Sequence, residues 1–442
     1  MLIFGENVLW LLVLIGVMIM IHELGHFWAA RYFDVKVEAF SFGFGPRLFG
    51  FRRGETDYRF SLILFGGYVK MAGDQAGDPN ANDPRSFLAK PRWQRLIIAF
   101  AGPFMNVVLA VALLTGLFMV KFQKIPDAEL QAVVGHVMPD SPAAKAGIQD
   151  GDRIVKLEGK SNPTWEDVGL KEVASAYRPL HLTIERNGKR FDTTVTPNLS
   201  ERTGVGFAGW DERGQVQLGN LEPGMPAVKA GLRKNDLILS ANGQPIHSQI
   251  KFHEIVQNSG GKPVEIELER DGQKQTMTVQ PVFSKLDGPE RWMIGALVEQ
   301  KVDVITTRLP FPAALAESVR QNARGATLIA QFLSGIVQRR MSPKSLEGPI
   351  SIARLSGEAA REGPSAFVML MSIVSLNLAV FNLLPIPILD GGVIMLLFIE
   401  MAMRRDLSIS VKEAVFKVGF VFIMMIVMFV IYNDISKIFP AG

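Results

Sequence analysis

Two histidines and a glutamate lie close together in an otherwise apolar stretch near the start of the chain. Residues 15–31 read IGVMIMIHELGHFWAAR and contain His22, Glu23 and His26. On a helix, residues four apart lie on one face, one turn from each other, so both imidazoles can bind the same metal ion. The glutamate between them can then act as the base for a water molecule at that metal. We therefore predict His22 and His26 as metal ligands and Glu23 as the catalytic base; the alternative is a helix with polar residues at a solvated end.

Composition places this stretch in a membrane protein of several domains. The chain has 442 residues, of which 48% are hydrophobic, and a net charge of +4. The small net charge does not indicate nucleic acid as a partner, and the absence of cysteine excludes disulfides and thiolate metal ligands. The first apolar stretch is not typical of a secretory signal, because basic residues follow it rather than precede it.

Four apolar segments are long enough to cross a lipid bilayer. We predict transmembrane helices at residues 1–31, 96–121, 364–403 and 412–434, of which the third ends in the proline-broken sequence NLLPIPILDGG. Lysine and arginine gather in segment 32–95 and in the connection before the last span, so both should be cytoplasmic. Both termini and the central segment are then expected outside the cytoplasm.

Segment 32–95 contains FSFGFGP (residues 40–46) and the apolar, β-rich sequence YRFSLILFGGYVKM (residues 58–71). One interpretation is a β-loop that enters the membrane face and pairs with an extended peptide, for which we name Gly66, Gly67 and Tyr68 as candidate substrate-binding residues. The alternative is an ordinary cytoplasmic hairpin. Residues 77–84 (GDPNANDP) are typical of a turn-rich linker.

The central segment contains an internal repeat with a constant offset of 84 residues. The sequence GHVMPDSPAAKAGIQDGDRIVKLEG at residues 135–159 matches GNLEPGMPAVKAGLRKNDLILSANG at residues 219–243. The pattern resembles the PDZ domain, so we predict two such domains at residues 126–200 and 210–283. They either bind peptides by strand addition or cap the membrane opening sterically. Asp152 and Asp236 are interpreted as turn formers. Residues 310–363 are expected to form amphipathic helices, at the outer membrane interface or packed on the repeats as linkers.

The third metal ligand must be a carboxylate. A catalytic zinc ion usually has three protein ligands, and the remaining histidines lie in the central segment, on the far side of the membrane: His136, His181, His247 and His253. Asp390 lies in PIPILDGG, where the prolines interrupt a helix and the glycines free the backbone, as at many intramembrane ion sites. We predict Asp390 as the third ligand of one Zn2+ ion; the alternative is a cap for the following helix. Four other acidic residues near span ends are assigned to solvated positions beside basic residues: Asp34, Glu38, Glu400 and Asp406.

Two amides precede Asp390 in the same segment. Asn377 and Asn382 either hydrogen-bond the backbone of an unwound substrate or hold helices together. Pro385 and Pro387 complete the candidate substrate-binding residues of this segment. Asn106, in the sequence AGPFMN of the second span, is a weaker candidate.

Taken in order, HELGH, GFGP, GGYVKM, AGPFMN, the tandem PDZ-like repeats and NLLPIPILDGG resemble the site-2 protease family of intramembrane zinc metalloproteases, over nearly the whole chain. The resemblance implies His22, His26 and Asp390 as zinc ligands, Glu23 as the base, a loop that presents substrate as a strand, and PDZ domains that filter substrates by size. It also implies a bacterial inner-membrane location, with the active site towards the cytoplasm.

The same resemblance implies single-span membrane substrates, such as anti-sigma factors in envelope stress signalling and remnant signal peptides. A first-cutting extracytoplasmic protease would act before this chain. The fold class is therefore a polytopic α-helical membrane protein with four transmembrane helices, two inserted β-rich PDZ domains and a membrane-associated β-loop. The alternative function is a catalytically inactive scaffold or a metal carrier with peptide-binding domains.

Overall fold

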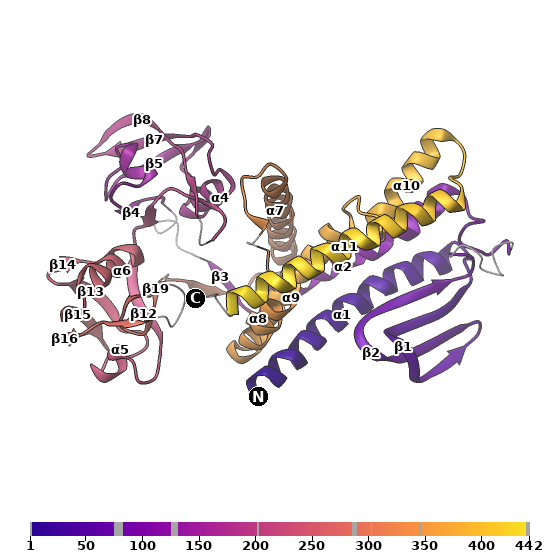
Figure 1. Ribbon diagram of the computed structural model, residues 1–442, viewed down its shortest axis with the longest axis horizontal. Helices are drawn as coiled ribbons and strands as arrows, with labels where there is room; N and C mark the ends of the chain where they lie inside the picture. The colour runs from indigo at the N-terminus through magenta and orange to yellow at the C-terminus, as the bar shows by residue number, and fades with distance from the viewer. Residues whose placement is uncertain are drawn as a thin grey trace. The chain divides into compact units, whose positions relative to one another are not determined.

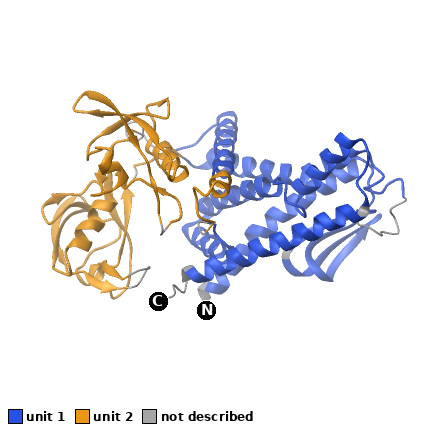
Figure 2. Cartoon of the chain, turned by 45° about the horizontal axis from the view of Figure 1, so that its top comes forward, with its two compact units in different colours: residues 1–122, 307–331, 346–442 blue, residues 123–306, 332–345 orange. Residues whose placement is uncertain are grey.

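The computed structural model describes residues 2–74, 83–124, 131–200, 203–284, 290–301, 303–343 and 346–438. The chain forms two compact units (Figure 2). One unit contains residues 1–122, 307–331 and 346–442, and the other contains residues 123–306 and 332–345. The predicted linker at residues 77–84 lies mostly outside the described residues.

The first unit consists of helices and one β-sheet (Figure 1). Its helices are α1 (Leu2–Tyr32), α2 (Arg92–Val120), α7 (Phe311–Val337), α8 (Pro349–Glu362), α9 (Pro364–Asn382), α10 (Asp390–Met403) and α11 (Ile409–Ile438). The last residues of α7 belong to the second unit. Within the described residues, four segments are long and apolar enough to cross a membrane: Phe4–Tyr32, Arg92–Val120, Pro364–Asn382 and Ser410–Ser436. Four membrane-crossing helices were predicted, but the third is shorter than expected. Predicted span 364–403 is two helices, α9 and α10, because the proline-rich segment between them breaks the helix.

Close helix contacts in this unit depend on small residues and hydroxyls. A side chain at Gly25 of α1 would meet the Ala101 backbone of α2, so the glycine lets the two backbones approach. Ser372 of α9 donates a hydrogen bond to the Ala110 carbonyl of α2 (3.0 Å). These contacts fix α2 between α1 and α9.

The loop after α1 forms a β-sheet from two long segments, β1 (Val37–Arg53) and β2 (Thr56–Met71). Each long segment changes partner along its length. Residues 39–42 pair with residues 67–70 on one side and with residues 57–60 on the other, and residues 57–60 also pair with residues 49–52. The end of β2 is therefore an edge strand of this sheet.

The second unit contains the two predicted repeats. The first comprises β4 (Val134–Val137), α3 (Pro142–Lys145), β5 (Arg153–Leu157), β6 (Lys160–Ser161), α4 (Trp165–Ala174), β7 (Leu180–Arg186), β8 (Lys189–Val195), β9 (Asn198–Leu199), β10 (Gly206–Phe207) and β11 (Trp210–Glu212). The second comprises β12 (Gln215–Leu221), α5 (Pro226–Lys229), β13 (Leu237–Ala241), β14 (Gln244–Pro245), α6 (Gln249–Asn258), β15 (Val264–Arg270), β16 (Gln273–Val279), β17 (Val282–Ser284), β18 (Arg291–Met293) and β19 (Ala296–Lys301). The short strands β3 (Phe122–Lys124) and β20 (Ile305–Thr307) pair with each other.

Each repeat has its own apolar core, and the same ion pair closes the same turn in both. Asp152 accepts hydrogen bonds from the Gln149 N–H (2.9 Å) and from the Arg186 guanidinium (2.7 Å). The equivalent Asp236 accepts a hydrogen bond from the guanidinium of Arg270 (2.7 Å). Both aspartates stabilise turns, as the sequence indicated.

Candidate metal centre

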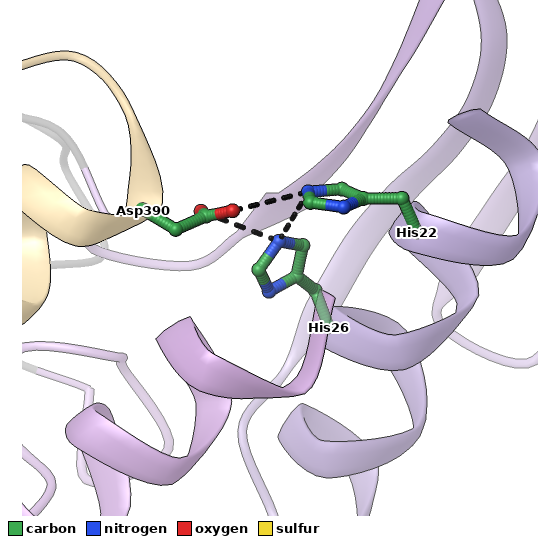
Figure 3. A group of neighbouring side chains, drawn as sticks. All are labelled: His22, His26 and Asp390. Carbon is green, nitrogen blue, oxygen red and sulfur yellow. Dashed lines mark hydrogen bonds and ion pairs between the residues drawn. The ribbon is translucent and has the colours of Figure 1, made fainter. Parts of the chain in front are cut away.

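Three side chains from the two ends of the chain meet in the helical unit (Figure 3). The Nε2 atoms of His22 and His26 lie 3.2 Å apart. The Asp390 carboxylate lies 3.1 Å from Nε2 of His22 and 3.4 Å from Nε2 of His26. Both histidines are buried, and they come from α1, whereas Asp390 is the first residue of α10. Among the described residues, this is the one group of three histidine, cysteine, aspartate or glutamate side chains whose ligand atoms lie close enough together to hold a metal ion.

The hydrogen bonds of the two imidazoles leave their Nε2 atoms free to bind a metal. Nδ1 of His26 donates to the Ile98 carbonyl of α2 (2.8 Å), which can only accept, so Nδ1 carries the proton. Nδ1 of His22 lies 3.1 Å from the side-chain amide of Asn106. An amide offers an oxygen after rotation by 180°, so Asn106 can accept the His22 proton. Two nitrogen lone pairs and a carboxylate then converge in a buried place, an arrangement that a cation stabilises.

The donor set and its spacing fit zinc. Zinc bonds to nitrogen and carboxylate oxygen are about 2.0–2.2 Å long, so the edges of its coordination tetrahedron are about 3.3 Å. The three separations in the cluster lie close to that length. On α2, a Cβ at Gly102 would lie 2.8 Å from Nε2 of His22 and still closer to His26. Glycine at this position therefore keeps open the space beside the two nitrogens.

The segment before Asp390 folds back on the start of α10. Side chains at Gly391 and Gly392 would meet the backbone of residues 383–387, so both glycines are needed for this close approach. Ile388 has a φ of 87°, a conformation that is strained for a β-branched residue. The alternative role for Asp390 is wrong: it is not the N-cap of α10, because Leu389 occupies that position.

Glu23 lies between the metal cluster and the sheet. A Cβ at Gly67 would lie 3.4 Å from Cγ of Glu23, and the backbone of Val69 also lies near the Glu23 carboxyl group. The edge strand at the end of β2 therefore runs beside the proposed catalytic base.

The other candidate substrate-binding residues lie in the same unit but outside the metal cluster. Tyr68 stacks on Phe44, with ring centroids 6.0 Å apart, and the Phe44 ring also fills the space beside Gly66. Asn377 and Asn382 are partly buried on α9. Pro385 and Pro387 lie in the break between α9 and α10, and Pro387 contacts Gly419 of α11 closely. The role of these residues in substrate binding stays a prediction.

Two residues have more specific surroundings than the sequence indicated. Asn106, considered a weak candidate, is fully buried and contacts His22 directly. Glu400, assigned to a solvated position, is fully buried. Its carboxylate accepts hydrogen bonds from Lys412 (2.6 Å) and from the Leu407 N–H (2.9 Å), and it lies 3.6 Å from Arg95. The solvated assignment of Glu400 is therefore wrong, because two cations compensate its charge inside the protein.

The sequence comparisons agree with this site. Residues 10–426 match the model of peptidase family M50. The chain belongs to peptidase family M50. It is 30% identical to the "Regulator of sigma-E protease RseP" of Salmonella typhimurium, over 98% of this chain and 100% of that protein. The identity is also 30% to the RseP of Escherichia coli K12, over 97% and 98% of the two chains, and 29% to a "Putative zinc metalloprotease" of Vibrio cholerae, over 98% and 100%. For this M50 protein, the predictions of a zinc metalloprotease and of Zn2+ as its cofactor are confirmed.

Proposed function

We propose that this M50 peptidase cleaves the membrane-spanning segments of single-span proteins inside the bilayer. The observation that carries the proposal is the convergence of His22, His26 and Asp390 between two apolar helices, with Glu23 beside them. Ionisable groups are costly at membrane depth and are generally functional there. A transporter would need polar groups along several spans, whereas these gather at one point.

The roles of the side chains follow from the geometry. His22, His26 and Asp390 would hold the zinc, which supplies a Lewis acid that polarises the scissile carbonyl and acidifies a bound water. Glu23 accepts a proton from the attacking water and delivers it to the amine that leaves. Asn106 and the Ile98 carbonyl orient the two imidazoles through their Nδ1 atoms.

Substrate would bind as a strand beside Glu23. A membrane helix hides its carbonyls in internal hydrogen bonds, so it must unwind before cleavage. Pairing with the edge strand at residues 66–71 replaces part of those hydrogen bonds. Asn377 and Asn382, just before the break at Pro385 and Pro387, would bind other carbonyls of the unwound segment.

The relatives named as regulators of sigma-E protease suggest the biological setting. We place the protein in the bacterial inner membrane, with its termini and the PDZ-like repeats outside the cytoplasm and its active site towards the cytoplasmic side. Its substrates would be anti-sigma factors already cut outside by another protease, and remnant signal peptides. The repeats would admit substrates that have lost their bulky outer domains.

The test combines cleavage with metal content. Glu23→Gln should keep one zinc per chain and lose cleavage of a co-expressed single-span substrate, because the amide cannot accept the proton. Glu6→Gln, in the same helix but at an ion pair with Arg361 (3.6 Å), is the matched control and should cleave normally. Cleavage by Glu23→Gln at the wild-type rate would remove Glu23 as the base. Loss of zinc in Glu23→Gln would mean that Glu23 belongs to the metal site instead.

A further inference from the structure

A carboxylate is buried where α2, α10 and α11 meet. Glu400, near the end of α10, is fully shielded from solvent. One of its oxygens accepts hydrogen bonds from the Lys412 ammonium of α11 (2.6 Å) and from the Leu407 N–H (2.9 Å), and the other lies 3.6 Å from the Arg95 guanidinium of α2. Burying charges costs much of what their pairing returns, so a buried ion pair is weak evidence for stability. Its best-attested use is to fix the register of packed helices.

A second carboxylate repeats the link between the end of α10 and the start of α2. Asp406, in the connection after α10, accepts hydrogen bonds from Arg92 (3.0 Å) and from the buried Arg95 (2.9 Å). Asp406 is exposed, so water screens its ion pairs, whereas the ion pairs of Glu400 are shielded. The Arg95 guanidinium therefore faces two carboxylates, of which Glu400 is the one on α10 itself.

The two helices joined in this way both carry parts of the metal centre. Three residues after Arg95 on α2, the Ile98 carbonyl accepts a hydrogen bond from His26 (2.8 Å). Helix α10 begins with Asp390 and packs against α2. Asp390 and Glu400 lie about 15 Å apart along the helix axis, at about 1.5 Å per residue. Since a short helix moves nearly as one rigid piece, a shift of Glu400 along α2 displaces the Asp390 carboxylate by a similar amount.

The other contacts of α10 do not fix its position along α2 as sharply. Its sequence is DGGVIMLLFIEMAM, so Asp390 and Glu400 are its two charged residues. Before Asp390 the chain passes through the proline-rich break, and α10 is therefore not a continuation of α9. Apolar packing has no preferred direction, and the remaining buried positions of α10 are Gly391, Gly392, Leu396 and Leu397. The ion pairs of Glu400 are therefore the directional contacts at the end of α10 away from the metal centre.

We propose that Glu400 is a positioning residue of the metal centre, which sets the place of α10 along α2 through its buried ion pairs and so holds Asp390 at the two imidazoles. The inference rests on the proposed zinc site of His22, His26 and Asp390. Glu400 acts from the other end of α10 and is not itself a metal ligand. Its loss would leave the zinc with two imidazoles and a displaced carboxylate. We expect the affinity for zinc to fall about tenfold, as for groups that orient metal ligands.

The experiment measures the zinc affinity of the purified full chain in detergent, by competition with a chromophoric chelator. Glu400→Ala is the test variant, and Asp434→Ala is the matched control. Asp434 is also buried in the helical unit, where it accepts hydrogen bonds from the N–H groups of Gly348 and Ile350 at the start of α8 (3.0 Å each). It lies about 33 Å from Lys412 along α11. Both variants remove a buried carboxylate, so both should unfold at a lower temperature, and the affinity is measured well below both midpoints.

Glu400→Ala should bind zinc about tenfold more weakly than the wild type, and Asp434→Ala should bind it with wild-type affinity. Because Glu400 acts through Asp390, the loss should vanish in the background of Asp390→Ala, where no third ligand is left to position. A general loosening of the fold would instead weaken binding in Asp434→Ala as well, or by the same factor with and without Asp390. Either of these results, or wild-type affinity in Glu400→Ala, would overturn the positioning role.

Asp390→Ala alone separates this inference from the proposed function. Wild-type zinc affinity in Asp390→Ala would refute the metal site and the inference together, whereas a loss there with normal affinity in Glu400→Ala refutes the inference alone. If Glu400→Ala does not fold, Glu400→Gln and Asp434→Asn replace the pair, since the amides keep the volume and remove the charge. Glu400→Gln should then bind zinc a few-fold more weakly and Asp434→Asn should bind it normally; equal affinities would overturn the proposal.

Discussion

Gly102→Ala is the sharpest test of the metal centre, because it adds one methyl group beside the two imidazoles. The added Cβ would lie 2.8 Å from Nε2 of His22 and 2.7 Å from Cε1 of His26, whereas ordinary contacts begin at 3.4 Å. Both imidazoles must therefore retreat, that of His22 by about 0.6 Å and that of His26 by more, whereas zinc bonds tolerate a change of about 0.2 Å. We expect the affinity for zinc to fall at least about 100-fold, equivalent to about 2.7 kcal/mol.

The assay is zinc affinity of the purified protein, measured by competition with a chromophoric chelator, with helix content followed in parallel. Gly116→Ala is the matched control: it makes the same change in the same helix, where the new Cβ meets nothing within 4 Å. It should bind zinc normally and stabilise α2 slightly, because alanine favours helix by up to about 1 kcal/mol. Wild-type zinc affinity in a folded Gly102→Ala would refute the geometry described for the two imidazoles.

Three other variants test separate parts of the structure. Asn106→Ala should weaken zinc binding about 10–100-fold, because His22 loses the side chain that orients it. The control is Ser375→Ala, which removes a hydroxyl that donates to the Asn106 backbone carbonyl and should leave zinc binding unchanged. Chelator competition compares the two variants, and equal zinc affinities would contradict the orienting role of Asn106. Glu400→Ala should lower stability by about 3 kcal/mol, because Lys412 loses its buried partner carboxylate, whereas Arg95 keeps its ion pair with Asp406; an unchanged thermal midpoint would show that the cluster contributes little. Burial raises the pKa of Glu172, on α4 of the first repeat, from 4.5 to about 7, so folding takes up a proton between these pH values. Stability of the repeat should therefore fall as pH rises from about 4.5 to about 7, by at most about 3 kcal/mol, and Glu172→Gln should flatten the profile measured by unfolding across that pH range.

Much of the site could be predicted because its chemistry leaves local signals. HELGH predicts one face of a helix that carries two imidazoles, and the prolines and glycines around Asp390 predict a broken helix. The exclusion of cysteine and of the remaining histidines then points to a carboxylate. These inferences need residue types and short spacings, which the sequence displays directly.

The contacts that the sequence did not predict are those between distant segments. The sequence neighbours of Glu400 suggest a solvated span end. Its ionic partners are distant along the chain, because Lys412 lies on the next helix and Arg95 lies about three hundred residues earlier. An amide such as Asn106 in an apolar helix is equally typical of helix packing, so its contact with His22 depends on how α2 packs against α1. The partner changes along β1 and β2 are likewise set by tertiary pairing, because the sequence pattern indicates strands but not their neighbours.

The positions of the three proposed zinc donors along the chain also affect biosynthesis. Two donors are made within the first thirty residues, and the third follows after more than three hundred and fifty others. A nascent polypeptide has at most two of the three groups for nearly the whole of its synthesis. A product that ends before residue 390 consequently lacks the third donor and should be inert as a hydrolase, so early termination should not release an active peptidase into the membrane.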